Sequence, residues 1–254
     1  MMDMERFSTR GYDILPAGNL EKLSGLRQEI FLKARELAGG GSEDAEEFMD
    51  NFHQLEIRGP ALNTMRMELI RYCTDKLNVG QTVFEAFEDT LLRLVGPDVV
   101  VQKTANLVIQ QPGDPDRVPT HRDAPQNSPF EVVVWVPLVK VYATKGMYVL
   151  DRDKTDVSLG MLQDPDSGYQ NQSKFTVDEG EVLDMPFGHA LMFWPGLVHA
   201  VDINLEQETR WALNIRYKSL FAPTGAKGQS EFFETLRLSP LARLAFDYEM
   251  EAQG

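Results

Sequence analysis

The sequence predicts a mixed α+β fold in which helices precede a β-sandwich or jelly-roll core. Up to Pro97, apolar residues recur every three or four positions, as they do on one face of a helix. After Pro97, short runs of β-type residues are separated by turn residues. Helices followed by strands, without βαβ alternation, are typical of α+β proteins. We expect the 254 residues to form one domain, because that length suits a single sizeable core.

The helical part, residues 1–97, contains four predicted helices. The first follows Asn19, a residue type that commonly caps helices, and it presents a regular apolar face. Ser42 can cap a second helix and Pro60 can open a third. The fourth ends at Gly96.

The predicted β core covers residues 98–223, and short apolar runs mark its strands. The strand candidates are 98–103, 105–110, 131–138, 146–150, 174–184, 190–195, 198–203 and 210–218. A polar, turn-rich segment at 151–173 interrupts the series. We expect a loop there, either a functional lid or a mobile insertion. Residues 224–254 are expected to form a helical tail.

The composition favours small-molecule partners. A formal net charge of −14 repels phosphate backbones and anionic lipid surfaces, so no nucleic-acid or membrane partner is expected. The single cysteine, Cys73, cannot form an internal disulfide, and no apolar run approaches the roughly 20 residues that span a bilayer. We therefore expect a cytoplasmic protein. The sequence does not indicate an oligomeric state.

A histidine and a carboxylate lie two residues apart in Thr120-His121-Arg122-Asp123. On an extended strand this spacing directs both side chains to one face, where they can hold a metal. By itself the pair is a weak signal, and a surface turn after Pro119 would be the better interpretation. A second histidine, His199, begins a strand candidate, and two histidines with one carboxylate form the facial triad of non-haem iron oxygenases.

Two other histidines are weaker candidates for the third ligand. His53 lies in the helical part, and His189 follows Gly188 in a predicted turn. An arginine distinguishes the candidates, since a buried 2-oxoglutarate carboxylate requires a planar, permanently charged partner. Arg210 lies on the strand after His199, whereas no arginine stands at the same offset from His189.

Further side chains can line the predicted site. Arg216 shares strand parity with Arg210 and is a second candidate for the 2-oxoglutarate anchor. Asn106 and Gln110 project to one side of their strand, where they bind a ligand or neighbouring backbone. Trp135 either walls the pocket or belongs to the core.

His121-Arg122-Asp123, His199 and Arg210, in that order, make residues 98–223 resemble the phytanoyl-CoA dioxygenase-like branch of the iron(II)/2-oxoglutarate oxygenases. The stretches 102–110, 112–114 and 128–135 look similar to oxygenases found among bacterial surface-carbohydrate genes. The segment 114–119 departs from the family pattern and leaves the roles of Asn106 and Gln110 open.

The resemblance implies a double-stranded β-helix, a jelly-roll and cupin-like core, with the metal at its open end. It implies that His121, Asp123 and His199 bind Fe(II) and that Arg210 pairs with the co-substrate 2-oxoglutarate. With O2, such an enzyme hydroxylates a small molecule, here a sugar or nucleotide-sugar, and releases succinate and CO2. Desaturation and epimerisation use the same parts. The alternative is a cupin-like metalloprotein that binds or isomerises a ligand without oxygen.

Overall fold

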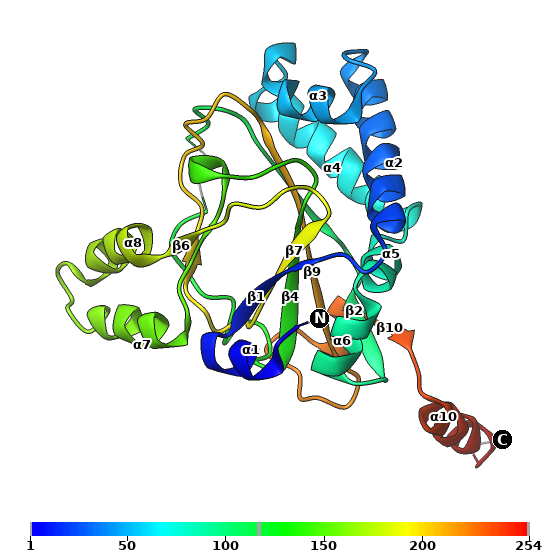
Figure 1. The fold of residues 1–254 in the computed structure, drawn as a ribbon. Coiled ribbons are helices and arrows are strands. Elements are labelled where there is room, and N and C mark those ends of the chain that lie inside the picture. The colour runs from blue at the N-terminus through cyan, green and yellow to red at the C-terminus, as the bar shows by residue number, and fades with distance from the viewer. Residues whose placement is uncertain (1, 116–117, 253–254) are drawn as a thin grey trace.

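The computed structural model describes residues 2–115 and 118–252. Most of its helices lie in the first hundred residues (Figure 1). The helices are α1 (Met4–Arg10), α2 (Leu20–Ala38), α3 (Ala45–Asp50), α4 (Gly59–Asp75), α5 (Val79–Ala86), α6 (Glu88–Val95), α7 (Arg152–Met161), α8 (Gly168–Glu179), α9 (Gln229–Phe232) and α10 (Pro240–Ala252), with short 3-10 turns η1 (Phe52–Leu55) and η2 (Ala143–Lys145).

The strands form two antiparallel sheets. The larger, seven-stranded sheet has the order β1-β7-β4-β9-β2-β10, and β3 also pairs with β9. The smaller sheet has the order β6-β5-β8. The strands are β1 (Tyr12–Pro16), β2 (Val99–Gln102), β3 (Asn106–Gln110), β4 (Glu131–Pro137), β5 (Tyr148–Val149), β6 (Glu181–Val182), β7 (His189–Phe193), β8 (His199–Ala200), β9 (Arg210–Ser219) and β10 (Phe233–Arg237).

Strand β9 separates the two hydrophobic cores of the molecule. Trp211 and Tyr217 belong to the core that the sheet shares with helices α2–α6, and Trp211 Nε1 donates a 2.9 Å hydrogen bond to the Met49 carbonyl. Ala212, on the opposite face, belongs to a second core together with residues of both sheets. Because side chains alternate along a strand, Arg210 and Arg216 share the face of Ala212. The predicted site residues of β9 therefore lie between the sheets.

Most predicted elements are confirmed with small shifts at their ends. The first three predicted helices correspond to α2, α3 and α4, and the fourth is divided into α5 and α6 at Phe87. The strands predicted at 98–103, 105–110, 131–138, 190–195 and 210–218 are β2, β3, β4, β7 and β9. The mixed character of the fold, with helices and antiparallel sheets, is likewise confirmed.

Three expectations about the chain are wrong. The segment 151–173 is not a loop, because α7 and the first half of α8 occupy it. The strand predicted at 174–184 is reduced to β6, since α8 continues to Glu179. Residues 224–254 are not purely helical, because β10 adds an edge strand beside β2 before α10 extends away from the sheets (Figure 1). The sequence also gave no indication of β1, which pairs with β7.

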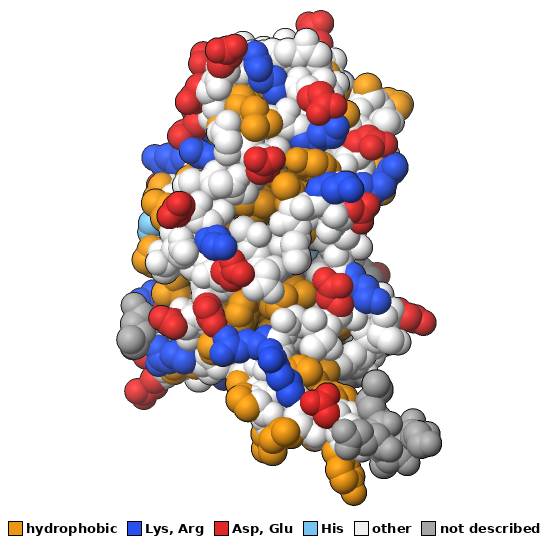
Figure 2. Space-filling model, turned by 90° about the vertical axis from the view of Figure 1, so that its right-hand side faces the viewer, with side chains coloured by type: hydrophobic (Ala, Val, Ile, Leu, Met, Phe, Trp, Pro, Cys, Tyr) orange, Lys and Arg blue, Asp and Glu red, His pale blue; other side chains and the backbone are white. Residues whose placement is uncertain are grey.

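The surface carries charges of both signs. On the face drawn in Figure 2, Asp and Glu side chains are scattered among Lys, Arg and hydrophobic ones rather than gathered in one place. Within the described part of the chain, no helix has both the length and the apolar character needed to cross a bilayer.

Candidate metal centre

A β-bridge places His121 and His199 side by side. Each donates its backbone N–H to the other's carbonyl, at 3.1 and 2.9 Å, and the ring centroids lie 4.3 Å apart. His121 Nδ1 lies 2.8 Å from the Pro119 carbonyl, and His199 Nδ1 lies 3.0 Å from the Leu197 carbonyl. A carbonyl only accepts, so both Nδ1 atoms carry a proton and donate it. In the neutral form of each ring, this tautomer leaves Nε2 with the lone pair that a metal ligand needs.

Asp123 completes a compact set of three ligands. One ligand atom from each of His121, Asp123 and His199 lies within 4.8 Å of the others, and Asp123 Oδ1 is 3.7 Å from His121 Nε2. Bonds of about 2.0–2.2 Å place two ligands of one ion roughly 3–4 Å apart. Small side-chain adjustments are therefore enough for all three to meet on one ion, and two imidazoles with a carboxylate fit Fe(II).

The protonation states favour metal binding. Burial, together with the neighbouring His121, lowers the pKa of His199 to about 4, which keeps its imidazole neutral near pH 7. Burial opposes the charge on Asp123, but the charge and the hydrogen bond of Arg216 outweigh it and hold the pKa of the carboxyl below its usual value. His199 and Asp123 are thus a neutral imidazole and a carboxylate, the forms that metals bind.

Arg210 is a buried cation without a counter-ion in the described part of the chain. Its side chain is one of the largest that are fully buried, with only 2% of the residue exposed. Nη1 donates a 3.1 Å hydrogen bond to the Gly146 carbonyl, while Nε has no hydrogen-bond partner. Burial alone lowers its pKa to about 10, so the guanidinium stays charged near pH 7. An unpaired buried charge is costly, and an anionic ligand would relieve that cost.

Arg216 is already engaged. Nη2 donates a 2.8 Å hydrogen bond to Asp123 Oδ2, and Nη1 donates to Gln102 Oε1 at 3.2 Å. The shared orientation of Arg210 and Arg216 expected from strand parity is confirmed, but their surroundings differ. The Nε of each arginine lacks a hydrogen-bond partner, but Arg216 is paired with a carboxylate and Arg210 contacts only a carbonyl among the described residues.

The two amides of β3 occupy different positions along the same face. Gln110 is paired with Arg210 in the register of β3 and β9, is buried, and donates a 2.9 Å hydrogen bond to the Asp202 carbonyl. Asn106 is paired with Asn214 and is exposed. Their roles as ligand-binding residues stay predictions.

The remaining histidines lie apart from the triad. His53 Nδ1 lies 3.2 Å from the Thr209 hydroxyl, and His189 begins β7 opposite Pro16. Neither belongs to the cluster of metal-binding groups among the described residues. Trp135 is buried in the core between the sheets.

Sequence analysis missed three residues that support the site. Gln102 and Glu131 contact Arg216, and the Thr155 hydroxyl accepts a 3.1 Å hydrogen bond from Val198 N–H, next to His199. Glu131 and Gln102 each stand in an otherwise apolar strand, and a polar residue in such a run is the feature that would have identified them.

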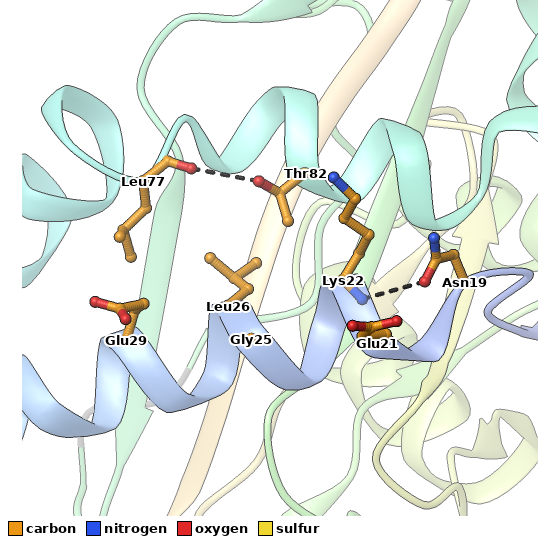
Figure 3. A pocket seen from close by; sticks show the side chains of 8 residues that line it. All are labelled: Asn19, Glu21, Lys22, Gly25, Leu26, Glu29, Leu77 and Thr82. Atoms are coloured by element: carbon orange, nitrogen blue, oxygen red, sulfur yellow. Dashed lines mark hydrogen bonds between the residues drawn. The ribbon is translucent and has the colours of Figure 1, made fainter.

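A separate cavity of about 470 Å³ opens between α2 and α5 (Figure 3). Glu21, Lys22, Glu29 and Thr82 are among its lining residues. It lies on the helical side of the molecule, and none of its lining residues belongs to the triad.

No protein-family model and no curated protein matches the sequence. Solved structures do match in three dimensions. The non-heme monooxygenase ThoJ, in its Ni complex, is 16% identical over 94% of this chain and 84% of that chain, with a TM-score of 0.55. The present chain and ThoJ share the same fold. EctD from S. alaskensis, in its apoform, is 13% identical over 94% of this chain and 87% of that chain, also with a TM-score of 0.55.

Another match has bound ligands. The epimerase SnoN in complex with Fe3+, alpha ketoglutarate and nogalamycin RO is 16% identical over 92% of this chain and 93% of that chain, with a TM-score of 0.49. At these identities the likeness concerns the fold alone, and no ligand or reaction is carried over.

Proposed function

We propose that this protein is a non-haem iron(II) and 2-oxoglutarate-dependent oxygenase whose metal is held by His121, Asp123 and His199. The observation that carries the proposal is the convergence of these three side chains within 4.8 Å, on the side of the large sheet that also buries Arg210, which has no carboxylate partner among the described residues. The shared fold with a non-heme monooxygenase supports it. We also propose that residues 1–254 form one domain and that its two sheets build a jelly-roll, the double-stranded β-helix.

When bound, iron(II) and 2-oxoglutarate supply the oxidation, in which O2 and 2-oxoglutarate give succinate, CO2 and a hydroxylated substrate. The chain supplies ligands, orientation and exclusion of water. Three protein ligands on one face of an octahedral ion leave three positions open. Arg210 pairs with the carboxylate of 2-oxoglutarate that does not reach the metal, and its free Nε–H and Nη2 donors suit that planar group. Gln110 and Asn106 extend the polar lining of the same face.

The substrate class comes from the sequence resemblance over residues 98–223. It assigns the chain to the phytanoyl-CoA dioxygenase-like branch and favours a sugar or nucleotide-sugar substrate. Hydroxylation is the default reaction, and desaturation or epimerisation would employ the same residues.

The deciding experiment measures succinate formed from 2-oxoglutarate under air by iron-loaded protein, with and without candidate sugars. We expect Asp123→Ala to abolish succinate formation, since a metal ligand is lost. We expect Arg210→Ala to raise the 2-oxoglutarate concentration for half-maximal rate by about 100-fold or more, since a buried charge-assisted pair is lost. Metal affinity should be unchanged in Arg210→Ala.

His189→Ala is the matched control, since it removes a histidine outside the triad. It should retain both metal binding and succinate formation. If wild type forms no more succinate than Asp123→Ala with any sugar, yet binds metal tightly, the cupin-like alternative without oxygen chemistry replaces this proposal.

A further inference from the structure

The carboxylate of Asp123 is divided between two environments. Oδ2 accepts the 2.8 Å hydrogen bond from Arg216 Nη2, and the two side chains are only 11% and 10% exposed. Oδ1 lies 3.7 Å from His121 Nε2, on the side of the imidazoles. Charge-assisted hydrogen bonds between groups withdrawn from water are stronger than neutral ones. One oxygen is therefore occupied by the protein, and the other faces the position of the ion.

Side chains on two neighbouring strands contact Arg216. Its Nη1 donates to Gln102 Oε1, at the end of β2, at 3.2 Å. Its Nε lies 3.8 Å from Glu131 Oε2, at the start of β4. Glu131 is held in turn, because its Oε1 accepts a 2.8 Å hydrogen bond from Ser128 N–H. Since β2, β4 and β9 belong to the same sheet, the sheet determines the orientation of the guanidinium.

We propose that Arg216 is a positioning residue that makes Asp123 bind the ion through Oδ1 alone. The inference rests on the proposed function. A carboxylate that binds through both oxygens would occupy a fourth position on the ion, and the three positions required by 2-oxoglutarate and O2 would no longer be free. By retaining Oδ2, Arg216 keeps the third of these positions open. Arg210 and Arg216 lie on the same face of β9 but thus have different roles. Arg210 binds the co-substrate, and Arg216 orients a metal ligand.

The test is titration of metal-free protein with cobalt(II), followed by visible absorption, which reports both affinity and coordination without turnover. We expect Arg216→Gln to bind cobalt about 10–100-fold more weakly, because partners of metal ligands contribute that much to affinity. We also expect the cobalt spectrum to change, since the carboxylate of Asp123 is no longer held in one orientation.

Lys218→Gln is the matched control. Lys218 is a fully buried cation two residues along the same face of β9, but its Nζ contacts the Ala222 carbonyl and Gln229 Oε1 rather than a candidate ligand. It should bind cobalt within about twofold of wild type with an unchanged spectrum. If Arg216→Gln does not fold, Arg216→Lys serves instead; it keeps the charge but lacks the planar fork, and we expect weaker binding and an altered spectrum.

Two results separate the inference from the proposed function. If wild type binds cobalt and the Arg216 variants match it in affinity and spectrum, the positioning role is overturned while the metal site stands. If wild type binds no cobalt, the proposed function is overturned together with the inference.

Discussion

At the scale of single residues, the buried cations of this molecule differ in their partners. Lys145 lies 2.7 Å from carboxylate oxygens of both Asp50 and Glu208. Arg216 is paired with Asp123. Arg210, equally buried, has one carbonyl partner and no described carboxylate at ion-pair distance. Among these three, Arg210 is therefore the cation whose charge has no carboxylate partner in the described part of the chain.

The sequence predicted which residues form the triad but not how they are supported. The spacing of His121 and Asp123, together with the strand position of His199 and the offset of Arg210, predicted the three residues that the structure brings together. Strand parity was enough to predict that Arg210 and Arg216 share a face. The hydrogen bond between Arg216 and Asp123 was not predictable, since it depends on how β9 meets a segment 93 residues earlier.

Cys73 provides a prediction at the same scale. Burial raises the pKa of its thiol to about 12, and the side chain is fully buried in α4. The reactive form is the thiolate, whose pKa is about 8.5 in an unfolded chain. Near pH 8 the folded protein should therefore react with a thiol reagent more than about 100-fold more slowly than the urea-unfolded protein. Equal rates in the two states would contradict this burial.

The hairpin of α7 and α8 is the part of the fold that the sequence pattern predicted least well. Its buried positions are polar or small: Thr155 and Ser158 in α7, and Gly168, Gln172 and Thr176 in α8. A search for apolar periodicity cannot detect such a face. The detectable feature was Asp151, whose side chain accepts a hydrogen bond from Lys154 N–H as a helix cap.

This hairpin is connected to the candidate metal centre through Thr155. Its hydroxyl accepts the buried N–H of Val198, the residue before His199, while the Val198 carbonyl accepts from Leu150 N–H. We expect Thr155→Val to lower the free energy of unfolding by about 1–3 kcal/mol, because the buried Val198 N–H loses its partner. Urea titration measures the change.

Thr155→Ser is the control for that prediction, since it retains the hydroxyl and removes one methyl group. It should lose less stability than Thr155→Val. The reverse order would mean that packing of the methyl group, and not the hydrogen bond, is what α7 contributes at this position.

At the scale of the whole molecule, the helical layer and the large sheet form one unit. Residues of α2–α6 and of β2, β4, β7 and β9 belong to a single hydrophobic core. The order of helices before strands predicted this arrangement in outline. It did not predict β1, because a five-residue strand between two helices carries little periodicity of its own and is defined by its partner β7.

Strand β1 allows a test of whether the helical layer and the large sheet form one unit. It covers one edge of β7, and Tyr12 and Leu15 enter different cores. Removing residues 1–18 should lower the urea midpoint and promote aggregation, because β7 becomes an open edge. A control truncation that removes residues 1–10 keeps the strand, and its urea midpoint should fall by less. Equal midpoints for the two truncations would show that the strand contributes nothing measurable.

The bridge between His121 and His199 closes a large loop of chain that contains β4, β5, the α7–α8 hairpin and β7. An ion bound to both imidazoles would act as a removable cross-link between the two ends of this loop. It would bind only after the two histidines have come together, so its binding free energy would add to the stability of the closed loop. Occupancy of the centre would then be coupled to the closure of this loop, and chelation would lower the stability of the segments that it contains.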